Sequence, residues 1–193
     1  MKFTKIPEET FSQLQLNAGV LLKNFDPANA TVTDTNIIGA TTGGINFTAT
    51  PTYSDRGEDI DNCPKNMKEL KNLDEWAVQL TGTFVTIKSD TAKMLIGSAD
   101  VDGTDSTKLV PRNDLSQSDF ADLWWVGDYS DKNGDTGGGY VAIHMMNTLS
   151  TGGFAIQTSD KGKGNFAFTF EAHYSMEAQD TVPFEVYIKN GVA

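Results

Sequence analysis

The sequence predicts a mainly β protein in which two packed antiparallel sheets form a β-sandwich, with one short α-helix on its flank. Residues 165–175 (NFAFTFEAHYS) alternate apolar and polar side chains, which is the pattern of a half-buried strand. The same alternation recurs in several other segments, each bounded by Gly, Asn, Asp or Pro. Helical periodicity is rare by comparison, so two layers of sheet are the expected architecture.

Composition limits the class of protein. The length of 193 residues fits one domain, residues 1–193, that buries its core without disulfides or metals. Cys63 is the only cysteine, the first residues lack a signal peptide, and no apolar run is long enough to cross a bilayer, which predicts a soluble cytoplasmic protein. The formal charge of -11 opposes the counterion release on which ordinary nucleic-acid binding depends.

The chain is predicted to begin with an arm and a strand. Residues 1–10 are polar and contain Pro7, so they form an N-terminal arm, with Phe3 and Ile6 as its apolar contacts. Residues 13–23 alternate and predict the first strand. The apolar face of this strand carries Leu14, Leu16, Ala18, Val20 and Leu22.

A hairpin and a long loop are expected next. Residues 35–40 and 45–53 flank a glycine-bearing turn, residues 41–44, and predict two antiparallel strands. Residues 51–73 then form an unusually long connection. Its acidic residues precede Cys63 and its basic residues follow it: Asp55, Glu58, Asp59 and Asp61, then Lys65, Lys68 and Lys71. Contact with another subunit would offset the entropy of so long an excursion, whereas a solvated loop is the alternative.

The rest of the chain is predicted to hold one helix and most of the strands. Residues 75–87 alternate over the greatest length and predict a central strand. Residues 89–96 predict a short helix with Ser89 as its N-cap and Gly97 as its stop. A short strand in 107–112 and a helical turn in 115–122 follow. The remaining strands are predicted at 123–128, 140–149, 154–158, 166–175 and 184–189.

Residue types that carry catalysis or bind metals form no convincing pattern. His144 and His173 have no zinc spacing, and no nucleophile elbow accompanies them, so a general base is only a remote alternative. An EF-hand alignment of Asp131, Asn133 and Gly134 places tyrosines where carboxylates are required, which favours a hairpin turn instead. We therefore predict a protein that is not an enzyme and that has no cofactor or metal.

Aromatic residues raise one other alternative, a carbohydrate-binding or host-recognition β-sandwich. Trp124 and Trp125, with Tyr129 and Tyr140, are the candidate sugar platform. Neighbouring strand residues point to opposite faces, so only one of the two tryptophans can serve. The favoured interpretation is one tryptophan in the core and the other at an interface.

Taken in order, four segments resemble the major tail (tail tube) proteins of long, non-contractile-tailed bacteriophages and related prophages. These segments are FSQLQLNAGVLLKNFDP (11–27), GATTGGINFTATPTYSDRGEDIDNCP (39–64), WWVGDYSDKNGD (124–135) and LSTGGFAIQTSDKGKGNFAFTFEAHYSMEAQDTVPF (149–184). The resemblance implies a sandwich whose copies form hexameric rings stacked into a tube around a tape-measure protein, closed by tail-end proteins. It also implies that the long loop and the N-terminal arm hold neighbouring copies, and that viral DNA passes through the lumen.

We therefore predict a structural subunit of the virion tail, made in the bacterial host cytoplasm and assembling with copies of itself. Edge pairing around a ring would hide the exposed strand edges of a sandwich. An acidic lumen would let DNA slide without adhering, which agrees with the net charge. The candidates for lumen-facing residues lie on the polar faces of the longest strands: Gln79, Thr81, Thr83, Thr169 and Glu171.

Overall fold

The computed structural model describes residues 6–7, 10, 13–129 and 138–190. Within these residues the chain is mainly β, with one short α-helix and antiparallel sheets, as the alternation predicted. The arm residue Phe3 and the predicted turn around Asn133 lie outside the described residues. Among the described segments, no helix combines the length and the apolar character needed to cross a membrane.

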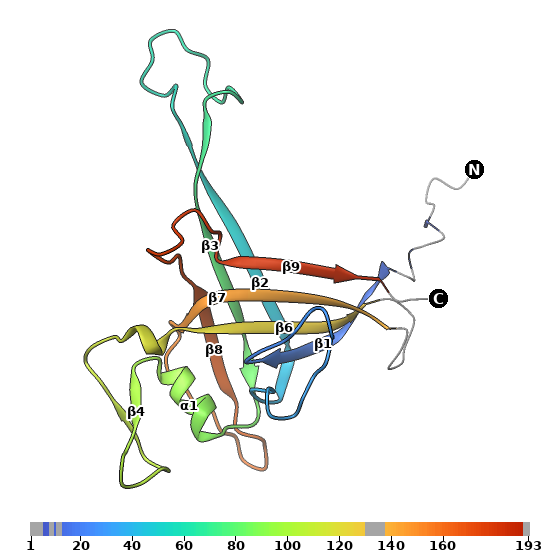
Figure 1. Ribbon diagram of the computed structural model, residues 1–193, viewed down its shortest axis with the longest axis vertical. Helices are drawn as coiled ribbons and strands as arrows, with labels where there is room; N and C mark the ends of the chain where they lie inside the picture. The colour runs from blue at the N-terminus through green and yellow to red at the C-terminus, as the bar shows by residue number, and fades with distance from the viewer. Residues whose placement is uncertain (1–5, 8–9, 11–12, 130–137, 191–193) are drawn as a thin grey trace.

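Seven strands form one sheet that folds into two layers (Figure 1). The first layer has β1 (Gln15–Leu22), β6 (Ala121–Tyr129), most of β7 (Gly139–Ser150) and β9 (Phe184–Lys189). The second layer has β8 (Phe166–Ala172), β3 (Lys71–Phe84) and β2 (Thr41–Asp55). The end of β7 joins the layers, because Leu149 and Ser150 leave the first layer and pair with β8.

The main core lies between the two layers, so the predicted packing of two sheets is confirmed. The second layer contributes Leu80, Phe84, Phe168 and Phe170, and the first layer contributes Leu21, Leu123 and Met145. Alternation explains this arrangement, since every second side chain of β3 and β8 points into the core. A second apolar cluster covers the outer face of the first layer, where Phe25 packs on Trp124 and Tyr140.

The predicted flanking helix is present as α1 (Ser89–Ile96), and Leu95 anchors it in the main core. Gly97 ends it with a φ of 82°, as the sequence indicated. The predicted N-cap was wrong: Lys88 occupies that position, without a side-chain cap hydrogen bond. The buried Thr91 ties the helix to the rest of the fold, because its hydroxyl donates to the carbonyl of Ile38 at 2.8 Å.

The hairpin predicted from residues 35–40 and 45–53 was wrong. Residues 41–44 belong to β2, which continues to Asp55 and pairs with β3 instead. Gly43 and Gly44 have φ values of 75° and 83° and lie where the register shifts, so they form a bulge and not a turn. A turn and a bulge both need glycine with a positive φ, so the local sequence cannot distinguish one from the other. Because the strands extend to Asp55 and from Lys71, the long loop is also shorter than predicted and spans 56–70.

The predicted first strand is present as β1, but its simple alternation is wrong. Asn17 and Gly19 have φ values of 56° and 69°, and the register with β6 shifts between Leu16 and Val20. Beyond the shift, Leu21 and Leu22 point to opposite faces as adjacent strand residues do, and both are buried because an apolar cluster covers each face: Leu21 lies in the main core and Leu22 in the outer cluster. The predicted strand at 154–158 is also absent, apart from a single bridge between Gln157 and Asn165.

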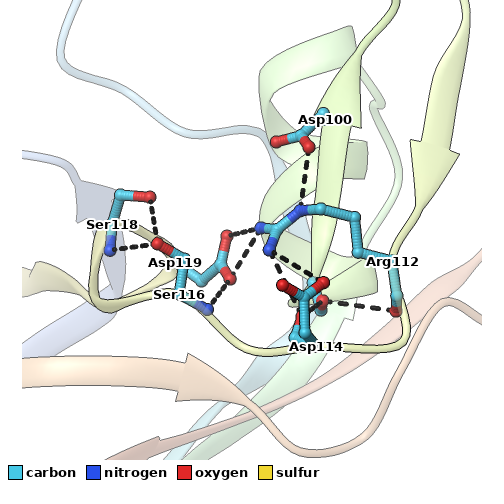
Figure 2. A network of polar contacts seen from close by, with 7 residues as sticks. Asp100, Arg112, Asp114, Ser116, Ser118 and Asp119 are labelled. Atoms are coloured by element: carbon cyan, nitrogen blue, oxygen red, sulfur yellow. Dashed lines mark hydrogen bonds and ion pairs between the residues drawn. The ribbon is translucent and has the colours of Figure 1, made fainter.

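Residues 98–120 form a projecting finger. β4 (Ala99–Val101) pairs with β5 (Leu109–Pro111), and a 3-10 turn (Gln117–Asp119) follows, in line with the short strand and helical turn predicted there. Figure 2 shows that Arg112 holds the base of the finger together. Its Nη2 donates to both carboxylate oxygens of Asp119, at 2.6 and 2.8 Å, and its Nε makes an ion-pair contact of 2.9 Å with Asp100.

Candidate assembly surfaces

The second layer turns a broad polar face away from the core, and all five predicted lumen residues lie on it. The register places Gln79 opposite Glu171 and Thr81 opposite Thr169, so they occupy neighbouring positions of β3 and β8. We call this surface the polar face. It consists of Thr42, Asn46, Thr48, Thr50, Thr52, Glu75, Ala77, Gln79, Thr81, Thr83, Ala167, Thr169 and Glu171.

The contribution of β2 to the polar face was missed by the sequence prediction. Asn46 lies opposite Thr81, and Thr48 lies opposite Gln79. Alternation between Ile45 and Pro51 had already indicated a strand with these residues on its polar side. The sequence did not show that β2 pairs with β3, because periodicity identifies which face of a strand is buried and not which strand lies beside it.

The ionisable residues of the polar face are all acidic. Glu75 and Glu171 are its ionisable residues, and none of its members is basic. Gln79 donates from Nε2 to Oε1 of Glu171 at 3.0 Å, which fixes both side chains on the surface of the sheet. Threonine hydroxyls and carboxylates therefore line this face, and they would repel a polyanion or leave it free to move.

In the large sheet, β2 and β9 present a backbone edge without a partner among the described residues. β2 pairs with β3 alone and β9 with β7 alone. The outer edge of β1 is partly covered, because Leu22 bridges to Ile37 and the backbone N–H of Ile38 donates to the carbonyl of Leu21. Free edges carry unpaired N–H and C=O groups and tend to pair with another chain. On β9 the side chains of Val186 and Ile188 are 49% and 63% exposed, so this edge combines backbone groups with apolar surface.

The β2–β3 hairpin extends past its own layer, as Figure 1 shows. β8 pairs with β3 only between Val78 and Phe84, so the rest of the hairpin has no third strand. On this overhang Tyr53 lies opposite Leu73, and the two side chains are 57% and 46% exposed. They continue the core-facing side of the hairpin beyond the point where the first layer covers it.

The tip of the hairpin, residues 56–70, is folded on itself. The carboxylate of Asp55 accepts hydrogen bonds from the backbone N–H groups of Asn66 and Gly57, both at 2.9 Å, and these bonds lower the pKa of Asp55. Gly57 is buried, and a Cβ there would lie 2.5 Å from Cδ1 of Leu70 and 3.0 Å from Sγ of Cys63. This compact turn gives the charged residues of the tip a defined position.

The predicted contact residues of the long loop lie on this tip and at its base. The segregation of their charges is lost in space at the base, where Asp55 and Glu58 line one hollow with Lys65 and Lys71. Lys68 lies 3.5 Å from Glu69, but both side chains are exposed, so the pair adds little stability. Asp59 and Asp61 are exposed. The arm residue Ile6 is 68% exposed.

Both histidines are engaged in packing and polar contacts. His144 stacks on Trp124, with ring centroids 4.0 Å apart, and its Nε2 lies 3.1 Å from Asp122. His173 lies with Nδ1 3.1 Å from the carbonyl of Asn147 and packs edge-on against Phe120. No serine, threonine or cysteine side chain is hydrogen-bonded to either ring among the described residues.

Most of the aromatic residues predicted as a sugar platform are packed against other parts of the fold. Trp124 and Tyr140 are 6% and 8% exposed, and the Tyr140 hydroxyl donates to the carbonyl of Pro27 at 2.6 Å. Trp125 lies on the opposite side of β6, as adjacent strand residues must, and its Nε1 donates to the carbonyl of Ala18. These contacts leave no broad aromatic surface on Trp124 or Tyr140 for a sugar ring.

The described residues thus present three distinctive surfaces: the polar face, the free strand edges and the projecting hairpin. No protein-family model matches the sequence, and a search of curated proteins finds no match either.

Proposed function

We propose that the chain is a structural subunit of a phage tail tube. Copies join side by side into rings, six to a ring as the resemblance to tail tube proteins implies, and the rings stack into a hollow tube in the virion tail. Viral DNA passes through the lumen without specific binding. The subunit acts by self-assembly and not by catalysis, and it needs no cofactor.

The free edge of β2 carries this proposal. It is fifteen residues long and pairs with β3 alone among the described residues. The opposite side of the same layer is also incomplete, because β7 covers β8 only near Phe170 and Glu171. Pairing the β2 edge of one copy with that side of the next would hide both edges and continue the layer around a ring.

The polar face supports its assignment to the lumen. If the second layers of successive copies join into one cylinder, their two sides become its inner and outer walls. The core-facing side is occupied by the first layer, so the polar face is the side that remains for the channel. Its threonines and glutamates suit a conduit for DNA, because basic groups there would retain phosphates.

The proposed partners of the tube are a tape-measure protein and tail-end proteins. A hollow cylinder of this kind needs something that sets its length, and a rod inside the lumen would contact the polar face. Tail-end proteins would complete the exposed strand edges and hairpins of the last ring. Both partners follow from the resemblance and from the open surfaces of the subunit.

Negative-stain electron microscopy of the concentrated full-length protein tests the proposal. We expect hollow rings at low concentration and tubes at high concentration, with a matching rise in sedimentation coefficient. A protein that sediments as a monomer at every concentration, with no rings in the micrographs, would contradict it. Polymers without a central channel would contradict the assignment of the lumen.

A further inference from the structure

The free edge of β2 lacks the charged side chains that usually protect an exposed strand. No Asp, Glu, Lys, Arg or His occurs between Thr41 and Ser54, in the segment TTGGINFTATPTYS. Soluble proteins normally protect such edges with charges, prolines or bulges, because an unprotected edge pairs with further strands. Of these devices, β2 has the glycine bulge at residues 43–44 and a proline at position 51.

Pro51 lies opposite Trp76 in the register of β2 with β3, and we call this pair the Pro51–Trp76 rung. Proline has no backbone N–H, so these two residues cannot exchange the two hydrogen bonds of a bonded pair. The N–H of Trp76 agrees with this, because it donates to the Tyr174 hydroxyl at 3.0 Å and not to β2. The backbone groups of Pro51 therefore face the free edge, where prolines of sheets are normally found.

Alternation extends this direction to the rest of the β2 edge. Backbone groups of successive strand residues point to opposite sides, so Ile45, Phe47 and Ala49 face the free edge as Pro51 does. The residues between them face β3 and bond to it. The edge therefore offers backbone N–H donors at Ile45, Phe47 and Ala49, and none at Pro51.

A hydrogen bond on β8 agrees with these directions. Val78 faces β8 as Trp76 does, and it lies opposite Ala172. Every second residue of β8 from Ala172 then faces β3, which directs the backbone groups of Thr169 away from β3. The carbonyl of Thr169 does accept on that side, from the N–H of Thr151 at 3.0 Å. The backbone directions in the second layer are therefore consistent from β8 to β2.

The Pro51–Trp76 rung is closed on its other side as well. β8 ends at Ala172, opposite Val78, so β3 has no paired strand on this side beyond that point among the described residues. Trp76 is the next residue of β3 whose N–H faces this side, and the Tyr174 hydroxyl occupies that N–H. A strand added on either side of the hairpin would thus find no free donor at this rung.

The closed rung coincides with the end of the three-stranded part of the layer. β8 pairs with Val78–Phe84 of β3, and this part of β3 lies opposite Thr41–Ala49 of β2. Pro51 is therefore the first outward-facing position of β2 beyond the support of β8. The glycine bulge at residues 43–44 interrupts the register at the other end. The regular part of the edge lies between these two interruptions.

We propose that the Pro51–Trp76 rung stops strand pairing, so that a second copy of this chain joins the β2 edge only along Ile45–Ala49. This inference rests on the proposed tube function, because it names the register in which copies pair within a ring. The strand of the partner finds donors along this stretch and ends where they end. A fixed stop gives every contact the same register, and rings of one size follow.

The stop also protects the unassembled subunit. Segments with high β propensity, low charge and no proline are those that stack into amyloid-like sheets. Pro51 interrupts the uncharged segment Ile45–Ser54, which alternates like a strand on both sides of the proline. With an N–H at position 51, the edge would continue without a break into the overhang, and strands could pair with it in more than one register.

Replacing the proline in the full-length protein tests the stop. Pro51→Thr restores the N–H without adding apolar surface. We expect irregular aggregates in electron micrographs and a several-fold rise in thioflavin T fluorescence, at the expense of uniform tubes. Pro111→Thr is the matched control, because Pro111 lies on β5, which pairs with β4 alone outside the second layer. This control should form tubes like the wild type. Uniform tubes and unchanged fluorescence from Pro51→Thr would overturn the proposed stop.

Placing a proline at two neighbouring positions tests the register. Ala49→Pro removes an N–H that faces the free edge, whereas Thr50→Pro removes one that faces β3. We expect Ala49→Pro to keep a higher urea midpoint than Thr50→Pro and to form no rings. Rings of wild-type size from Ala49→Pro, or a midpoint no higher than that of Thr50→Pro, would overturn the register while wild-type rings still support the proposed function. A wild type that forms no rings at all would instead overturn the proposed function.

Discussion

Close packing around single residues decides which side chains the core tolerates. Gly82 of β3 lies on the core-facing side, and a Cβ there would fall 2.6 Å from Cζ of Phe168. Phe168 cannot move easily, because it is 2% exposed and its ring lies 4.4 Å from that of Phe84 and 5.4 Å from that of Phe170. Glycine is therefore required at this position for space and not for an unusual φ.

Replacing this glycine should destabilise the subunit. We expect Gly82→Ala to lower the free energy of unfolding by about 1–3 kcal/mol, because an overpacked core costs more than the ~0.5–1 kcal/mol that alanine gains over glycine in backbone entropy. Urea denaturation followed by tryptophan fluorescence measures the difference. Gly103→Ala is the control, since no atom lies within 4 Å of a Cβ there. Equal stability of the two variants would contradict the packing argument.

At the scale of elements, the finger of residues 98–120 depends on one buried carboxylate. The side chain of Asp119 is 1% exposed and that of Arg112 is 20% exposed. Hydrogen bonding from the backbone N–H of Ser116, followed by contact with the Arg112 guanidinium, lowers the pKa of Asp119 below its ordinary value of 3.8. A lowered pKa means that the ionised form stabilises the fold, and this contribution is lost as the pH falls through the lowered value.

Asp119→Asn should therefore destabilise the protein in a pH-dependent way. We expect a clear loss of stability relative to the wild type at pH 7, shrinking as the pH falls below 3.8. Denaturant unfolding of both proteins at neutral and acidic pH provides the measurement. Asp114→Asn is the matched control, because that side chain is 83% exposed and 3.7 Å from Arg112. A wild-type advantage that is unchanged in acid would show that the charge of Asp119 does not matter.

The hairpin is the other element whose behaviour follows from its contacts. β2 and β3 pair with each other over their whole length, yet β8 supports only the part from Val78 to Phe84. The overhang is held mainly by its own cross-strand bonds and by the hydrogen bonds of Asp55 at the tip. Such an element gives little stability to its own copy, which agrees with the proposed role between copies.

At the scale of the whole molecule, the sign of charge on the polar face should govern how a tube treats DNA. Thr48→Lys with Thr81→Lys adds cations next to neutral partners on β2 and β3. We expect these tubes, assembled with short duplex DNA at low salt, to retain DNA that resists nuclease. Wild-type tubes should retain none, because their lumen lacks the cations that bind phosphates.

The position of the lysines, and not their number, should decide the outcome. Thr31→Lys with Thr181→Lys adds the same charge at exposed positions outside the polar face. DNA bound by this control should be fully digested, since it would lie on the outside of the tube. Digestion of DNA held by the Thr48 and Thr81 variant as well would mean that the polar face does not line the lumen.

The amino-acid pattern was enough to predict the mainly β class, the short helix before Gly97, and the faces of β3 and β8. These features depend on interactions between near neighbours, and alternation records which side of a strand is buried. Three features became visible only in the folded chain: residues 41–44 form a bulge within β2, Leu21 and Leu22 belong to two different clusters, and the hairpin extends beyond its layer. Strand pairing joins residues far apart in the sequence, so it depends on the packing of the whole chain and leaves no local pattern to read.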